Sequence, residues 1–127
     1  MAKEKPFNGG NWTASRKRSF IYSTLRSGRW PVKYQCIKDA ERGTRINPET
    51  GRKRKVYLCS DCGELFPQKE VVADHISPIV PVTGFDTWDA FIGRLFCEID
   101  GYQALCKECH QKKTNIENKK RKEARNV

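Results

Sequence analysis

The residues best suited to chemistry are two pairs of cysteines. Cys59-x-x-Cys62 and Cys106-x-x-Cys109 have the spacing at which a short knuckle presents two thiolates to zinc. Together they supply four thiolates, which is the number that a closed tetrahedral zinc site needs. We therefore expect a structural Zn²⁺ site, with a redox-active Cys-x-x-Cys as the alternative.

One aspartate and the only two histidines accompany these cysteines. Asp74 and His75 are adjacent between the two pairs, and His110 directly follows Cys109. Zinc binding would bring the carboxylate and both imidazoles together, and such a trio can hold a second metal ion and activate water. His75 could instead be a structural histidine. His110 could instead bind the zinc, because Cys-x-x-Cys-His offers a fifth candidate for four positions.

Composition and cysteine usage favour a small domain that is stabilised by metal. The 127 residues are 37% hydrophobic and 31% charged, so the core is thin, and small domains often add a metal or disulfides. Six cysteines could form a secreted disulfide framework. However, residues 1–10 contain no apolar stretch resembling a signal peptide, and no segment is long enough to span a bilayer. Cys36 and Cys97 are expected to be buried thiols.

The formal charge of +10 at pH 7 is typical of a protein that binds nucleic acid. The alternative is a basic protein whose charge serves solubility alone. Clustering of the charge into blocks around the metal residues favours a polyanion, and we expect DNA. The predicted DNA-binding residues are Arg16, Lys17, Arg18, Arg52, Lys53, Arg54, Lys55, Lys112, Lys113, Lys119, Lys120, Arg121 and Lys122.

Helices are predicted for the first half of the chain. Residues 1–11 are expected to be disordered, and helices are expected at 13–27 and at 31–42, with Gly43 as the stop of the second. The side chains expected to be buried are Phe20, Ile21 and Leu25 in the first helix and Trp30, Tyr34 and Ile37 in the second. Residues 43–54 show no periodicity and are predicted to form a mobile basic loop.

Short strands are predicted to carry the site. Strands at 56–58 and 71–73 would lead into the first knuckle and deliver Asp74 and His75. A helix at 86–96 would lie within a loop, a strand at 101–105 would enter the second knuckle, and a basic helix would run from 107 to about 124. The chain then divides into a disordered N-terminus (1–11), a helical extension with a basic loop (12–54), and a core with a basic C-terminal helix (55–127).

The segments Val-Ala-Asp-His-Ile-Ser-Pro at 72–78 and Leu-Cys-Lys-Glu-Cys-His-Gln-Lys-Lys-Thr at 105–114 resemble the zinc-containing branch of the HNH endonuclease family. The resemblance covers about 58–120, and the N-terminal helices are similar to those of small phage-encoded HNH proteins. It implies an α+β fold, in which a small ββα-metal core clamps one divalent ion and the four-cysteine zinc site frames it, with an N-terminal helical extension.

The resemblance also implies roles for the three remaining residues. His75 would be the general base of phosphodiester hydrolysis, and an imidazole is largely neutral at pH 7 as that role requires. Asp74 and His110 would bind Mg²⁺ or Mn²⁺, and a mixed oxygen and nitrogen ligand set also accepts Co²⁺ or Ni²⁺. The family's middle Asn is missing, because the local run is Asp-Gly-Tyr-Gln at 100–103. Gln103 is the candidate to supply its hydrogen bond.

The expected function is a metal-dependent DNA endonuclease of phage type that acts in the cytoplasm of a bacterial host. It would be a free-standing homing-like enzyme or a partner of the phage packaging machinery. One alternative is a junction-resolving nuclease, which would need a dimer. No long heptad segment predicts one, so a monomer is favoured. The other alternative is a non-catalytic zinc-ribbon module, which would need neither Asp74 nor His75.

Overall fold

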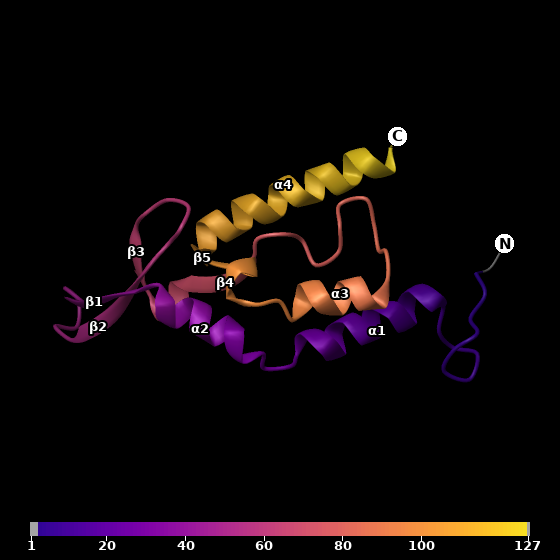
Figure 1. The fold of residues 1–127 in the computed structure, drawn as a ribbon, viewed down its shortest axis with the longest axis horizontal. Helices are drawn as coiled ribbons and strands as arrows, with labels where there is room; N and C mark the ends of the chain where they lie inside the picture. Colours follow the sequence, from indigo (N-terminus) through magenta and orange to yellow (C-terminus); the bar gives the residue numbers. More distant parts are fainter. Residues whose placement is uncertain (1–2, 127) are drawn as a thin grey trace.

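The computed structural model describes residues 3–126, which form four α-helices and two small antiparallel sheets (Figure 1). Residues 1 and 2, which belong to the predicted disordered N-terminus, and residue 127, the last of the predicted core, lie outside this range. The elements are α1 (Ala14–Arg26), α2 (Pro31–Asp39), β1 (Glu41–Ile46), β2 (Lys53–Leu58), β3 (Leu65–Pro67), η1 (Gln68–Glu70), β4 (Val71–His75), α3 (Trp88–Leu95), η2 (Ile99–Gly101), β5 (Tyr102–Cys106) and α4 (Lys107–Arg125). The predicted α+β class is confirmed.

The two-stranded sheet of β4 and β5 lies between helices (Figure 1). Because side chains alternate across a strand, Val71 and Ala73 face α2 together with Tyr102, whereas Leu105 faces the cysteines and α4. The α2 side is the larger core cluster, and its buried members are Cys36, Ala40, Tyr57, Val71, Tyr102 and Ala104. The sheet thus has one face packed on α2 and the other on α4.

Helix α1 begins and ends close to the predicted positions. Oγ1 of Thr13 accepts a hydrogen bond from the backbone N–H of Arg16, 3.1 Å away, as an N-cap does. The predicted buried stripe is partly wrong, because Phe20 is 56% exposed. The ring of Tyr22 instead stacks on Phe91 of α3, with 4.8 Å between centroids. Tyr22 also contacts the rings of Phe85 and Trp88, so α1 docks through an aromatic cluster.

Helix α2 is shorter than predicted. Pro31 starts it as expected, but it ends at Asp39, and residues 41 and 42 belong to a strand. The carbonyl of Ala40 accepts a hydrogen bond from the N–H of Leu58, so the chain begins to pair with β2 directly after the helix ends. The predicted burial of Tyr34 is also wrong, since that side chain is 58% exposed.

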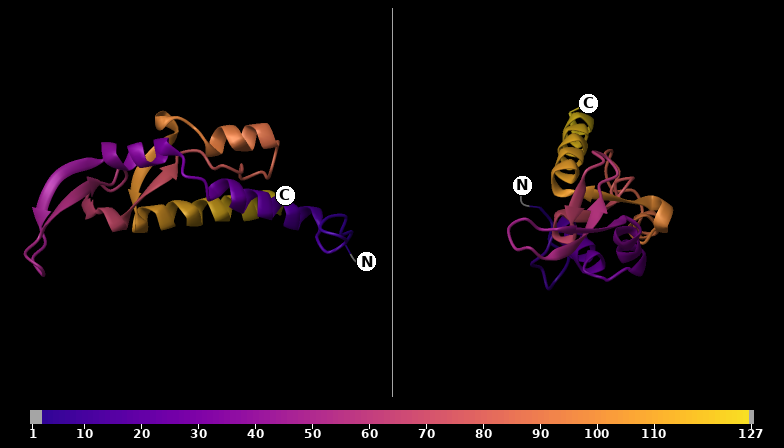
Figure 2. Two further views of the ribbon diagram at one scale, coloured as in Figure 1. Left: turned by 90° about the horizontal axis from the view of Figure 1, so that it is seen from below. Right: turned by 90° about the vertical axis from the view of Figure 1, so that its left-hand side faces the viewer.

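The predicted mobile loop at 43–54 is a β-hairpin. Strand β1 pairs antiparallel with β2, and the hairpin projects beyond the body of the molecule (Figure 2). Gly43, predicted to stop a helix, has a φ of 83° and lies where the pairing register shifts. A left-handed residue at such a bulge favours glycine. Residues 44–46 are exposed on both faces of the strand, which is why no apolar alternation revealed it.

The predicted disorder of residues 1–11 is wrong for residues 7–11. The backbones of Phe7 and Trp12 form an antiparallel bridge that closes a tight turn. Trp12 packs on Phe20 of α1 with 5.4 Å between ring centroids, and the ammonium of Lys17 lies 4.0 Å from the centroid of Phe7. Aromatic contacts and cation–π contacts thus tie this segment to α1.

Candidate metal centre and active site

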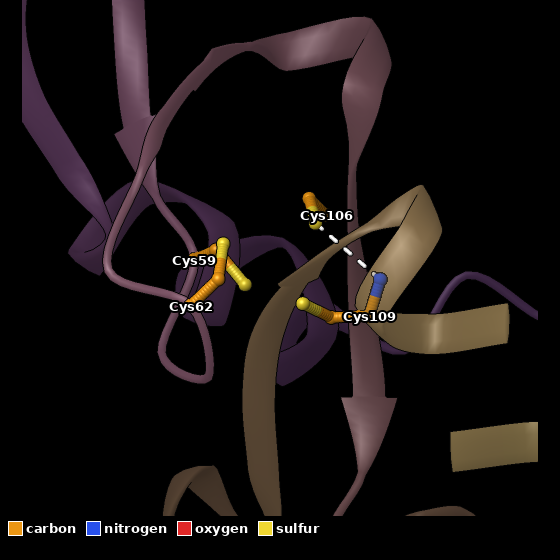
Figure 3. A group of neighbouring side chains, drawn as sticks. All are labelled: Cys59, Cys62, Cys106 and Cys109. Carbon is orange, nitrogen blue, oxygen red and sulfur yellow. Dashed lines mark hydrogen bonds between the residues drawn. The ribbon is translucent and has the colours of Figure 1, made fainter. Parts of the chain in front are cut away.

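Four cysteine sulfurs converge from the two knuckles (Figure 3). The ligand atoms of Cys59, Cys62, Cys106 and Cys109 all lie within 4.8 Å of one another. Tetrahedral zinc with Zn–S bonds of about 2.3 Å places its sulfurs about 3.8 Å apart, so only small rotations are needed to close the site. Four thiol donors with no oxygen or nitrogen among them are the ligand set of structural zinc. The residues present therefore fit the predicted ion.

Hydrogen bonds hold the two knuckles against each other. The N–H of Gly63 donates to the carbonyl of Cys59, and Gly63 has a φ of 75°, which the tight turn requires. The N–H and the hydroxyl of Ser60 both donate to the carbonyl of Ala104, at 2.9 Å each, and so join the first knuckle to β5. The sulfur of Cys106 caps α4 by accepting from the N–H of Cys109. The four-cysteine cluster is thus built into the start of α4.

The thiols of this cluster differ in acidity. Burial alone would raise the pKa of Cys59, but N–H groups of Cys106, Cys62 and Asp61 donate to its sulfur and lower the pKa to about 6. The pKa of Cys109 is raised, first by its hydrogen bond with Cys106 and then by burial. Four adjacent thiolates repel one another, and a divalent cation removes that repulsion.

Asp74 lies in the β4–β5 sheet opposite Gln103 and is buried, with 8% of its surface exposed. Its Oδ2 accepts a hydrogen bond from Nε2 of Gln103 at 3.0 Å and forms an ion pair with Nζ of Lys113 at 3.1 Å. Gln103 thus supplies a hydrogen bond, but to the predicted metal ligand itself rather than to a loop. The ammonium of Lys113 also contacts the backbone carbonyl of His75 and the carboxylate of Glu117. The carboxylate of Asp74 is therefore held in one orientation.

The other carboxylate oxygen of Asp74 faces His110. Oδ1 lies 3.6 Å from Nε2 of that imidazole. Two ligands bound about 2.1 Å from one ion are about 3.0 Å apart at adjacent octahedral positions and about 4.2 Å apart at opposite ones. The observed spacing falls between these values, so one divalent ion fits between the two atoms. His110 points at Asp74 and is not part of the sulfur cluster, which answers the question whether it replaces a cysteine.

His75 projects from the opposite face of β4, toward α3. Its Nε2 lies 2.9 Å from the carbonyl oxygen of Leu95, and its ring lies 4.6 Å from that of Tyr102. Because a carbonyl oxygen only accepts, we infer that Nε2 carries the proton and that Nδ1 of the neutral ring has the free lone pair. Leu95 is the last residue of α3, where carbonyls lack helical partners. The end of α3 thus orients this imidazole.

Asp74, His75 and His110 line one pocket of about 300 Å³, although Asp74 and His75 lie on opposite faces of the strand. The backbone after His75 forms part of its wall and is held from two helices. Nε of Arg94 donates to the carbonyl of Ile79 at 2.6 Å, and Nη2 of Arg121 donates to the carbonyl of Val80 at 2.9 Å. Arg94 also forms a bidentate ion pair with Asp86. A larger cleft of about 880 Å³ beside α4 contains none of the three.

The predicted DNA-binding residues occupy three regions. Arg16, Lys17 and Arg18 lie on α1 and contact aromatic rings of Trp12, Phe7 and Phe85. Arg52, Lys53, Arg54 and Lys55 lie on or beside the hairpin strand β2. Lys112, Lys113, Lys119, Lys120, Arg121 and Lys122 lie on α4, where Lys113 and Arg121 are engaged in the contacts described above. Of these residues, Lys113 and Arg121 alone line the 300 Å³ pocket.

Two further cations that line that pocket were not predicted from the sequence. Arg26 ends α1 and Lys33 lies in the first turn of α2, and both side chains are exposed and line the pocket with Asp74 and His110. Each is separated from the basic blocks, so clustering gave no signal for them. The predicted buried thiol Cys36 is confirmed, while Cys97 is half-buried, and burial raises the pKa of both.

Within residues 3–126, no helix combines the length and apolarity that crossing a bilayer requires. Comparison with protein-family models, with curated proteins and with solved structures gives no match to this chain.

Proposed function

We propose that this protein is a metal-dependent DNA endonuclease that hydrolyses phosphodiester bonds at the pocket of Asp74, His75 and His110. The observation that carries the proposal is that this pocket contains both a candidate metal-binding pair and a separate candidate base. One carboxylate and one imidazole are spaced for a single divalent ion, and the second imidazole is oriented separately with one nitrogen free. A buried carboxylate and an oriented base are the groups that metal-assisted hydrolysis needs in addition to binding.

The arrangement of β4, β5 and α4 supports a ββα-metal core of the HNH type. Strand β4 pairs with β5 from Val71 to His75, and α4 follows β5 directly at Cys106. Asp74 comes from the first strand and His110 from the first turn of the helix, so the metal ligands bridge the two kinds of element. Zinc at the four cysteines would fix this helix turn and, with it, His110.

The hydrolytic step requires a base, and His75 is placed to provide it. Nδ1 would take the proton from the attacking water, which leaves a positive imidazolium. Both the carbonyl of Leu95 and the partial negative charge at the end of α3 stabilise that cation. A divalent ion held by Asp74 and His110 would neutralise charge on the phosphate. Arg26 and Lys33 would place further positive charge near it.

Zinc-ribbon modules without catalysis are the competing class. Such a module would keep the four cysteines and the basic surface, but would not need an imidazole that faces the free oxygen of Asp74. A junction-resolving nuclease would use the same pocket and differ in its substrate. Cleavage of a linear duplex without junctions distinguishes the proposed endonuclease from a junction-resolving nuclease.

The test is incubation of zinc-loaded protein with supercoiled plasmid in Mg²⁺, in Mn²⁺, and without divalent metal. The proposal expects nicked or linear plasmid with the added ion and intact plasmid without it. An Asp74→Asn variant should retain zinc and leave the plasmid intact with or without added Mg²⁺ or Mn²⁺. Intact plasmid under every metal condition, from protein with a full zinc content, would overturn the proposal.

A further inference from the structure

A groove leads away from the catalytic pocket between the N-terminal helices and β4. It has a volume of about 840 Å³ and shares Arg26, Lys33, Ala73 and His110 with the pocket, so the two adjoin. A second hollow of about 730 Å³ beside β2 shares Lys55, Tyr57, Gln68 and Val71 with this groove. The three hollows therefore lie one beside the next between the pocket of Asp74 and His110 and the base of the hairpin.

This path is lined with cations. Arg26, Arg29, Lys33 and Lys38 line the groove, and all four side chains are exposed. Within the described part of the chain, none of the four forms an ion pair. Glu41 is the only acidic residue among those that line the groove, and its carboxylate is paired with Lys55 at 3.2 Å. The groove thus presents uncompensated positive charge along its length.

The hairpin continues the same charge. Arg54 of β2 lines the hollow beside that strand, and Arg45 of β1 lies directly opposite it on the same face of the ribbon. Arg52 directly precedes β2. None of the three forms an ion pair among residues 3–126. Like charges directly opposite each other destabilise an antiparallel pair. An anion bound across this face would remove that repulsion.

We propose that the groove and the arginine face of the hairpin hold the phosphodiester backbone of one DNA strand on one side of the scissile phosphate. The inference rests on the proposed function for the position of the scissile phosphate at Asp74 and His110. Cations distributed along a path suit a polymer with regularly repeated charge, whereas a single small anion would need them to converge on one point. Contacts of this kind position the strand and do not read its sequence.

The test compares two triple variants of the full chain that lose the same charge. Arg26→Gln, Arg29→Gln and Lys33→Gln remove three cations from the groove. Lys3→Gln, Lys5→Gln and Lys107→Gln remove three exposed cations that line none of the three hollows. All six residues are exposed, so circular dichroism and zinc content should match the unmodified protein in both. Binding of a fluorescein-labelled 30-base-pair duplex is measured in Ca²⁺ at several salt concentrations.

The groove triple should bind at least about tenfold more weakly, and its log–log salt slope should be smaller by about 2.7, or 0.9 per lost phosphate contact. The control triple should change the affinity less than about threefold.

The outcomes separate this inference from the proposed function. Equal effects of the two triples, with plasmid cleavage intact, would overturn the groove and leave the nuclease. Binding that depends on the groove, without cleavage in Mg²⁺ or Mn²⁺, would overturn the nuclease and leave the groove as a DNA-binding surface. Absence of DNA binding by the unmodified protein would overturn both.

Discussion

Oδ1 of Asp74 lies 3.6 Å from Nε2 of His110, and it faces that imidazole because Gln103 and Lys113 hold the other oxygen. The two residues are far apart in the chain and come together through two constraints. Strand pairing sets Asp74 against β5, and the second cysteine knuckle sets the first turn of α4 beside it. The spacing leaves room for one divalent ion, and the proposed chemistry depends on that ion.

Zinc at the knuckles should be needed for folding. Structural zinc contributes roughly 10 to 16 kcal/mol in small domains, as much as the 5 to 15 kcal/mol of a typical folded protein. Cys59→Ser or Cys106→Ser should therefore unfold the core, as circular dichroism and elemental analysis can show. Cys97→Ser, a matched change outside the cluster, should keep zinc and fold. Active protein without zinc would contradict this role.

Lys113 should oppose metal binding at Asp74. Its ammonium lies 3.1 Å from Oδ2, so it repels a divalent cation bound at the same carboxylate. Lys113→Gln should lower the Mn²⁺ concentration for half-maximal cleavage by about tenfold, equivalent to about 1.4 kcal/mol. Lys107→Gln on the same helix serves as the control and should leave the metal requirement unchanged. An increased Mn²⁺ requirement in Lys113→Gln would mean that this lysine orients Asp74 more than it repels the ion.

Arg121 should act on the rate rather than on DNA affinity. Although it was predicted to bind DNA, its guanidinium donates to the carbonyl of Val80 in the wall of the pocket. Displacement of reacting groups by about 1 Å can cost about a hundredfold in rate, so Arg121→Gln, which loosens this wall, should slow cleavage at saturating DNA by about tenfold or more. The exposed Arg125→Gln should not. A change confined to the salt dependence of binding would return Arg121 to the DNA-binding residues.

Cleavage should show little sequence preference. No described element presents a pattern of base-reading side chains, and the basic residues of the hairpin and of α4, other than Lys113 and Arg121, are exposed and free to contact phosphates. Six such contacts would cost about a thousandfold in affinity between 50 and 200 mM salt. Ends mapped on a mixed DNA pool should be widely distributed. One dominant site with a long consensus would indicate a strict homing enzyme instead.

The candidate site could be predicted from the sequence because its chemistry is carried by short-range neighbours. Asp74 and His75 are adjacent on a strand, so their side chains point to opposite faces of the sheet. His110 directly follows Cys109, so the second cysteine knuckle fixes its position. The hydrogen bond that orients His75 could not be predicted in the same way. It comes from the carbonyl of Leu95, twenty residues further along the chain, and depends on where α3 packs.

The hairpin and the groove could not be predicted because they have no apolar pattern. Residues 44–46 are exposed on both faces, so the alternation that usually reveals a strand is missing. Arg26, Arg29 and Lys33 are spread over the end of α1, a linker and the start of α2. Only the packing of these segments against β4 brings the three cations to one groove.

The most direct test of the account is the single-turnover cleavage rate of His75→Ala at saturating DNA and Mg²⁺. A general base contributes about 10² to 10⁴ in rate, so the variant should lose cleavage while it keeps its zinc and its affinity for DNA. Added imidazole should restore part of the rate, which loss of a merely structural histidine would not allow. Cleavage within about threefold of the unmodified protein would contradict the assignment of His75 as the base.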